Sequence, residues 1–270
     1  MIRICIAAVA ALALAACSKA PEDVTARYAL AGGAGTITVQ AAGNGDARVE
    51  SGQQVLVRKG GTEYLLVTDS QGRFAAKMED FIAAMGEMIR EAGMKPTGLP
   101  PQSEYDLAKT GSETVAGIPG DVWKVSAKGA AKAGPAETVE AVISGDPAYA
   151  NVGKALTMQT RLGTAGMQQV QGGAGNLEKK VAEMLDKGMV LRFGDAIKLE
   201  KVEKAPIEPS SFTLPAVLDK AALKTRMTAE RERARAAAAK AMPGGAPSAP
   251  APAPAPTAAP APAPAPAPGR

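Results

Sequence analysis

The sequence lacks histidine altogether and contains only two cysteines, Cys5 and Cys17, in 270 residues. Without histidine, a Ser-His-Asp triad, an HExxH zinc site and imidazole acid–base catalysis near neutral pH are excluded. Because both cysteines precede the segment expected to fold, that segment has no thiol for a disulfide, a cysteine-based zinc site or a nucleophile. We therefore expect no cofactor, no metal and no catalytic activity. An enzyme built on carboxylates is the least favoured alternative.

The N-terminal segment has the order of a secretory signal. Met1-Ile2-Arg3 is a short basic start, residues 4–13 are uninterruptedly apolar, and small residues follow up to Cys17. This apolar run is too short for a permanent membrane-spanning helix, and the small residues are typical of a cleavage site. An uncleaved anchor helix is the alternative interpretation.

The four residues Leu14-Ala15-Ala16-Cys17 resemble the lipobox of bacterial lipoproteins. The resemblance implies that residues 1–16 are a signal peptide and that Cys17 is acylated on its sulfur. Acyl chains buried at ~0.8 kcal/mol per CH2 hold a soluble body on a membrane when more than one chain is present. Ser18 stands where an aspartate would resemble an inner-membrane retention signal, so we expect a lipid anchor in the bacterial outer membrane, facing the periplasm.

Positive charge is concentrated near the C-terminus. The chain has 31 basic and 27 acidic residues, and the segment 219–242 alone carries seven basic and three acidic side chains. With four Tyr, four Phe and one Trp and a nearly neutral remainder, the chain is not expected to bind nucleic acid. Anionic lipid, lipopolysaccharide or wall polymers are available partners for the basic segment. A solvated spacer is the other interpretation of it.

Residues 27–215 are expected to fold as one domain after a lipidated tether, 17–26. Alternation of apolar and polar residues, interrupted by glycine turns, predicts an antiparallel meander, and Asn44-Gly45 is a strong hairpin signal. Strands of this kind are predicted over 36–40, 47–50, 55–58, 63–68, 73–76, 105–109, 120–127, 138–143, 189–193 and 196–202.

Two further stretches have helical periodicity. Apolar residues recur at steps of three and four between Met78 and Ile89 and predict an amphipathic helix over about 79–92. Residues 147–187 are predicted as two helical pieces, the second with Asn176 as its N-cap.

Methionine is abundant for a chain so poor in aromatic residues. Flexible thioethers either fill an imperfect core under the helices or line an adaptable apolar pocket, and the sequence leaves both interpretations open. The candidate pocket residues, taken from the predicted helix and from the single tryptophan, are Phe81, Met85, Met88, Ile89 and Trp123.

The C-terminal part is expected to lie outside the domain. Residues 216–242 are rich in strong helix formers and predict a basic helix whose apolar positions thin out along the chain. Residues 243–270 are a Pro/Ala-rich repeat, which cannot form regular backbone hydrogen bonds and favours polyproline II. We expect this tail to be disordered.

Three stretches resemble uncharacterised bacterial envelope lipoproteins, which are grouped as a domain of unknown function with a LolA/LolB-like shape. Residues 109–125, KTGSETVAGIPGDVWKV, resemble the central hairpin of that family, and Phe212-Thr213-Leu214-Pro215 is similar to its closing strand. The meander over 36–50 also fits the start of the family. At Gly120 the sequence departs from the family, which often carries cysteine there.

The resemblance implies an α+β fold with a strongly curved antiparallel half-barrel and helices on its concave face, where lipoprotein carriers hold acyl chains. Two functional hypotheses follow. In the first, the protein is a non-catalytic binding protein that shelters a lipid or another apolar ligand between sheet and helices. In the second, it is a structural tether whose basic helix and Pro/Ala tail contact peptidoglycan or an envelope protein.

Overall fold

The computed structural model describes residues 21–93, 104–128, 138–171 and 176–241. Cys17, the predicted signal peptide (1–16), the predicted tether up to residue 20 and the Pro/Ala-rich tail lie outside the described residues. By its internal contacts the chain divides into two units, Met1–Thr228 and Ala229–Arg270.

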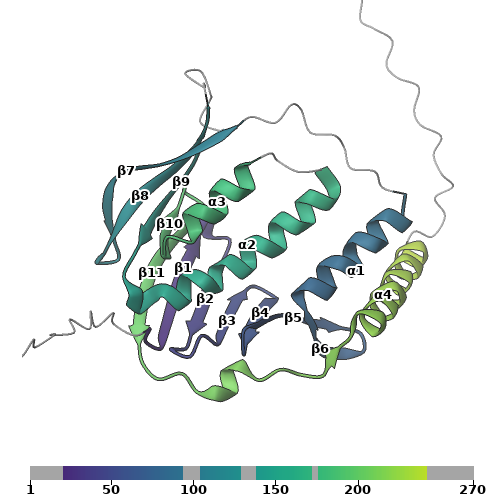
Figure 1. The fold of residues 1–270 in the computed structure, drawn as a ribbon. Helices are drawn as coiled ribbons and strands as arrows, with labels where there is room; N and C mark the ends of the chain where they lie inside the picture. Colours follow the sequence, from purple (N-terminus) through teal and green to yellow (C-terminus); the bar gives the residue numbers. More distant parts are fainter. Residues whose placement is uncertain (1–20, 94–103, 129–137, 172–175, 242–270) are drawn as a thin grey trace, which may run out of the picture. The chain divides into compact units, whose positions relative to one another are not determined.

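The first unit is an α+β fold built on a single, unclosed, curved sheet (Figure 1). The sheet has 12 strands in the order β12-β6-β5-β4-β3-β2-β1-β11-β10-β9-β8-β7. Neighbouring strands are antiparallel, except that β12 runs parallel to β6. The strands are β1 (Val24–Leu30), β2 (Thr36–Ala41), β3 (Ala47–Ser51), β4 (Gln54–Lys59), β5 (Thr62–Asp69), β6 (Gly72–Lys77), β7 (Tyr105–Val115), β8 (Ile118–Ala127), β9 (Thr138–Ser144), β10 (Met189–Phe193), β11 (Ile197–Lys204) and β12 (Val217–Leu218).

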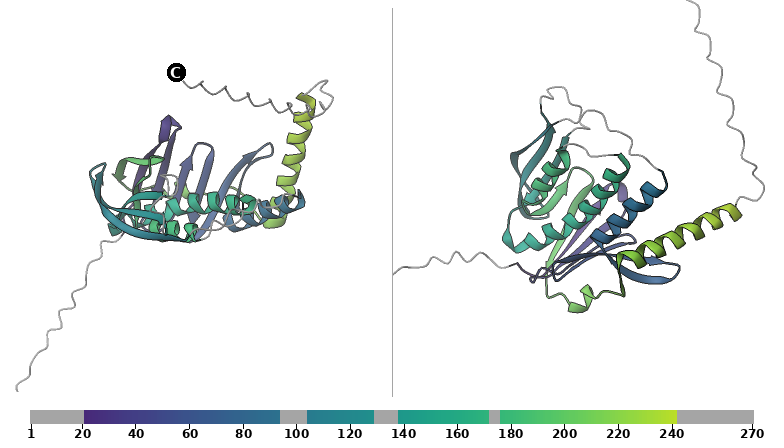
Figure 2. Two further views of the ribbon diagram at one scale, coloured as in Figure 1. Left: turned by 90° about the horizontal axis from the view of Figure 1, so that it is seen from above. Right: turned by 45° about the vertical axis from the view of Figure 1, so that its right-hand side comes forward.

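Three helices cover one face of this sheet (Figure 1, Figure 2). The helix α1 (Met78–Glu91) packs on β5 and β6, α2 (Ala150–Gln171) on β2, β3, β4 and β10, and α3 (Leu177–Leu185) on β7, β8 and β9. A flat sheet with strands ~4.8 Å apart would span roughly 50 Å, whereas three helices ~10 Å apart cover roughly 30 Å. Since α2 contacts both other helices, the sheet curves around the helix layer.

The predicted meander and the helical periodicity are confirmed. The strands β2 to β6 and the helix α1 lie within two residues of their predicted bounds, and 147–187 contains α2 and α3 as two pieces. The hairpin β7–β8 is longer than predicted, with Ala116 and Gly117 at its turn, both at positive φ. Most residues of β7 are exposed, so no alternation of apolar and polar residues marks the length of this strand.

The sheet also begins earlier than predicted. Val24 and Ala26 are fully buried, and β1 pairs with β2 and β11 from Val24 onward. Asp23 fixes this end, because its Oδ1 accepts a hydrogen bond from the Gly43 amide (2.7 Å) and its Oδ2 accepts one from the Ile207 amide (2.9 Å). Residues 24–26, assigned to the tether from the sequence, therefore belong to the sheet.

The core between sheet and helices is mainly aliphatic. Among the described residues, the buried polar side chains are those of Ser144 and Asn151. Met78, Met158, Met184 and Met189 are at most 3% exposed. For these four methionines the core-filling interpretation is confirmed.

Two glycines permit close packing in this core. A Cβ atom at Gly120 would lie 2.8 Å from Leu191 Cδ1, 2.9 Å from Val142 Cγ1 and 3.1 Å from the Ile143 carbonyl carbon. The position therefore has no space for a larger side chain such as that of cysteine. A Cβ atom at Gly153 on α2 would lie 2.3 Å from the Gly188 carbonyl oxygen. The start of α2 therefore lies directly against the backbone at Gly188, between α3 and β10.

Asn176 stands at the N-cap position of α3, as predicted. Its side chain makes no capping bond to α3. Instead its Oδ1 accepts a hydrogen bond from the Tyr105 amide (2.7 Å), and its Nδ2 donates one to the Tyr105 carbonyl (3.1 Å). Asn176 thus pairs with the backbone of β7 as a short strand would, because both groups of an edge residue are available there.

The first unit extends beyond the predicted boundary at residue 215. The strand β12 pairs with β6, and the helix α4 (Lys220–Ala241) begins inside the first unit. Leu223 of α4 is fully buried. Among the described residues, no helix is both long and apolar enough to cross a membrane.

Candidate functional site

An apolar cleft lies between α2, the end of α3 and the strands β10 and β11. It has a volume of about 200 Å³. Gln159 and Thr160 of α2 contribute its polar groups, and no charged residue lines it. Its apolar lining consists of Leu156, Leu185, Val190, Phe193 and Ile197.

Tyr28 belongs to the core cluster that also contributes residues to this cleft. The residue lies on β1, and its side chain is fully buried in the core cluster that also contains Leu156 and Val190. Leu199 is its partner on β11, so Ile197 of the cleft is its diagonal neighbour on the same face. Among the described residues, the Tyr28 hydroxyl has no hydrogen-bond partner.

This hydroxyl is energetically costly. A buried hydroxyl without a partner costs about 1–3 kcal/mol, because its hydrogen bonds to water are lost and not replaced. Burial also raises the pKa of the Tyr28 phenol well above its ordinary value, since the phenolate would be still harder to desolvate. Tyr28 is therefore a buried donor for which the described residues supply no acceptor.

The structure does not bring the candidate pocket residues together. Phe81 packs between the main core and the cluster beside β6. Met85, Met88 and Ile89 are half-buried on α1. Trp123 lies on β8, near the opposite end of the strand order, and packs in the cluster beneath α3 with Lys187 Nζ 5.2 Å above its ring. None of these five residues lines the apolar cleft.

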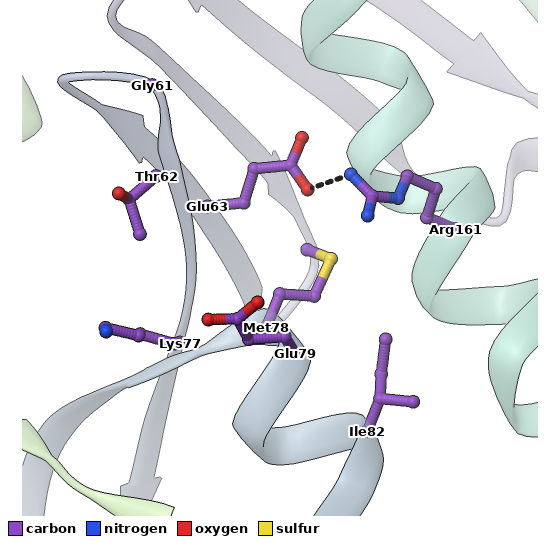
Figure 3. Close-up of a pocket in the computed structure, with 8 residues that line it drawn as sticks. All are labelled: Gly61, Thr62, Glu63, Lys77, Met78, Glu79, Ile82 and Arg161. Atoms are coloured by element: carbon purple, nitrogen blue, oxygen red, sulfur yellow. Dashed lines mark hydrogen bonds and ion pairs between the residues drawn. The ribbon is translucent and has the colours of Figure 1, made fainter.

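A second cavity, of about 280 Å³, lies on the other flank of α2 (Figure 3). It is polar, and side chains of both charges line it: Glu63 on β5, Lys77 at the end of β6, Glu79 on α1 and Arg161 on α2. Arg161 Nη1 donates to Glu63 Oε2 at 2.7 Å, the contact drawn in Figure 3. Sequence reasoning missed both cavities, because each is formed by elements distant in the chain.

A third feature is the docked start of α4, residues 220–228, here named the α4 root. Leu223 is fully buried against Phe74, Ala76 and Ala84. Arg226 makes a two-pronged ion pair with Asp69, with distances of 2.7 and 2.6 Å.

Two lysines add to the α4 root. Lys220 and Lys224 contact Glu87 of α1 at 2.6 and 3.1 Å. Hydrogen bonds from Lys220 and Lys224 lower the pKa of Glu87 to about 2. The Glu87 carboxylate therefore stays ionised, and these contacts persist, until the pH falls below its ordinary range.

Beyond the root, residues 232–240 of α4 are exposed. Their charged and small side chains are spread around the helix without an apolar face, which is atypical of a helix that lies in a membrane surface. The solvated-spacer interpretation therefore gains support for this segment.

Comparison with known proteins gives no relative. The chain matches no family model, and no curated protein sequence matches it. Within the described residues, no three His, Cys, Asp or Glu side chains are grouped so that they could hold a metal ion. The resemblance to the envelope lipoproteins thus stays a prediction.

The unpaired hydroxyl generates a testable effect on alkaline stability. Folded Tyr28 keeps its proton above pH 10, where an unfolded tyrosine loses it, so folding stability falls as the pH rises past 10. The slope from this residue is about 1.4 kcal/mol per pH unit. We expect Tyr28→Phe to raise the free energy of unfolding by about 1 kcal/mol at pH 8 and to reduce the alkaline slope. Urea titrations between pH 8 and 12 measure both, and equal slopes for the two proteins would contradict this assignment.

Proposed function

We propose that the protein is a non-catalytic lipoprotein of the bacterial outer membrane, anchored through acylated Cys17, that binds an acyl chain between its sheet and its helix layer. The observation that carries this proposal is the Tyr28 hydroxyl, which has no hydrogen-bond partner among the described residues and is buried in the core cluster that contributes Leu156 and Val190 to the apolar cleft. An acyl chain satisfies both features. Its methylenes match the aliphatic lining, and its ester or carboxyl oxygen accepts the Tyr28 hydrogen bond.

The architecture supports the same proposal. An unclosed curved sheet with three helices on its inner face has the arrangement that the resemblance to LolA/LolB-like half-barrels implies. Fold alone does not transfer a cargo. The ligand class here therefore rests on the chemistry of the cleft and of Tyr28.

Binding requires the helix layer to open. A cleft of about 200 Å³ is below the ~300–1,000 Å³ of typical ligand pockets. The start of α2 is fixed, because buried Asn151 donates a hydrogen bond to the Ala42 carbonyl (2.8 Å) and Gly153 touches Gly188. Farther along, α2 has a cavity on each flank. The ligand would enter as this later part of α2 moves away from β10 and β11.

Native mass spectrometry of the protein extracted from its membrane in mild detergent tests the proposal. We expect a co-bound lipid mass in addition to the covalent anchor. Tyr28→Phe removes one hydrogen bond of about 1.4 kcal/mol and should lower ligand occupancy about tenfold under subsaturating conditions. Leu156→Trp should lower it further by filling the cleft.

Tyr64→Phe is the matched control, since Tyr64 lies in the cluster on the other face of the sheet. It should leave occupancy unchanged. A folded wild-type body without co-bound lipid would contradict the proposal. So would equal occupancy in all variants.

The tether hypothesis has one specific observation in its favour, which is the α4 root. A buried leucine and the ion pairs of Lys220, Lys224 and Arg226 fix the base of the C-terminal extension to the body. A firmly held base is what a segment that carries load to a wall polymer or partner requires.

The structure determines where a truncation must be made. Deletion of residues 216–270 would remove Leu223 and expose Phe74 and Ala76, whereas deletion of 229–270 leaves the α4 root intact. If the extension binds the wall, the 1–228 protein should keep its melting temperature and lose at least fivefold in co-sedimentation with purified peptidoglycan. Unchanged co-sedimentation would exclude the tether role for this segment.

A further inference from the structure

We propose that the polar cavity between α1, α2 and β5 binds a small amphoteric peptide that carries a free amine and more than one carboxylate. This site lies on the other flank of α2 from the apolar cleft. The proposal therefore goes beyond acyl-chain binding and does not depend on it.

Arg161 is positioned to bind a carboxylate. Glu63, with only 16% of its side chain exposed, holds one guanidinium nitrogen at 2.7 Å, while the Arg161 side chain is 65% exposed. The guanidinium has five N–H donors, and among the described residues Glu63 is its hydrogen-bonding partner. Arg161 lines the cavity (Figure 3), where a carboxylate can pair with two of its remaining donors.

Lys77 and Glu79 supply a second cation and an anion. Both line the cavity, and within the described part of the chain neither makes a side-chain hydrogen bond or ion pair. Two opposite charges that border one cavity without pairing can each receive a ligand group of the other sign. Lys77 suits a second carboxylate, and Glu79 suits an ammonium group.

The adjoining surface extends the same chemistry along α1. A shallower depression shares Glu79, Ile82 and Arg161 with the cavity and adds Arg90. Arg90, too, has no ion-pair partner in the described residues. The available cations thus outnumber the available anion, which favours a ligand with more carboxylates than amines. Met78 and Ile82 offer apolar contact for a short side chain.

Two sources in the envelope have this chemistry, namely the peptide stems of the wall and free acidic oligopeptides. Isothermal titration calorimetry on the full chain in detergent micelles distinguishes them with two probes. One is a purified muropeptide with a tetrapeptide stem, and the other is the all-L tripeptide Ala-Glu-Ala, which has one free amine and two carboxylates. Binding of either supports the site, and the tighter probe assigns the source.

Variants locate the binding. We expect Arg161→Gln and Lys77→Ala each to raise Kd at least tenfold for the probe that binds. Glu79→Gln should also raise Kd, and this effect should disappear when the free amine of that probe is acetylated. Lys179→Ala on α3 and Glu200→Gln on β11 are exposed charge controls outside the cavity and should leave Kd unchanged.

The proposal is overturned if neither probe gives a binding isotherm. It is equally overturned if the cavity variants and the control variants change Kd alike, since that result indicates only general charge attraction. Circular dichroism of each variant shows that the fold is kept.

Discussion

The packing of α2 across the middle of the sheet is the contact on which the rest of the structure depends. The strands β1 to β6 form one meander and β7 to β11 another, and within the sheet the two meet where β1 pairs with β11. Helix α2 contacts β2, β3 and β4 of the first meander and β10 of the second. Val152, Ala155 and Leu156 bury their side chains in the same cluster as Val24, Ala26 and Tyr28. The two halves are therefore held as one body by a single pair of strands and one helix.

This arrangement places both cavities beside the same helix. The apolar cleft lies between α2 and strands of the second meander. The polar cavity lies between α2, α1 and strands of the first meander. Asn151 and Gly153 fix the start of α2, and the Glu63–Arg161 pair bridges to it farther along. A displacement of α2 would thus change the apolar cleft and the polar cavity together.

Much of the fold could be predicted from the sequence, because local patterns determine it. Alternating apolar and polar residues between glycine turns predicted β2 to β6. Apolar residues recurring at steps of three and four predicted α1. The extent of β7 was not visible, since an exposed edge strand needs no apolar face. The N-cap position of Asn176 was predicted, but its side-chain bond to Tyr105 was not, because the two residues lie 71 positions apart. The candidate pocket stays a prediction, with Trp123 on β8 and the other four residues on α1. Trp123 and Phe81 are both aromatic, and the sequence does not show that they lie on distant elements. Tyr28 becomes notable only because its buried hydroxyl has no hydrogen-bond partner among the described residues.

The central claim is that the layer beneath α2 opens for an acyl chain that satisfies Tyr28. A crystal structure of the lipidated protein, purified from its own membrane without exchange of lipid, tests it most directly. The account predicts elongated density between α2 and β10–β11, with an oxygen atom about 2.7–2.8 Å from the Tyr28 hydroxyl. A closed aliphatic layer without such density, and a Tyr28 hydroxyl still unpaired, would contradict it.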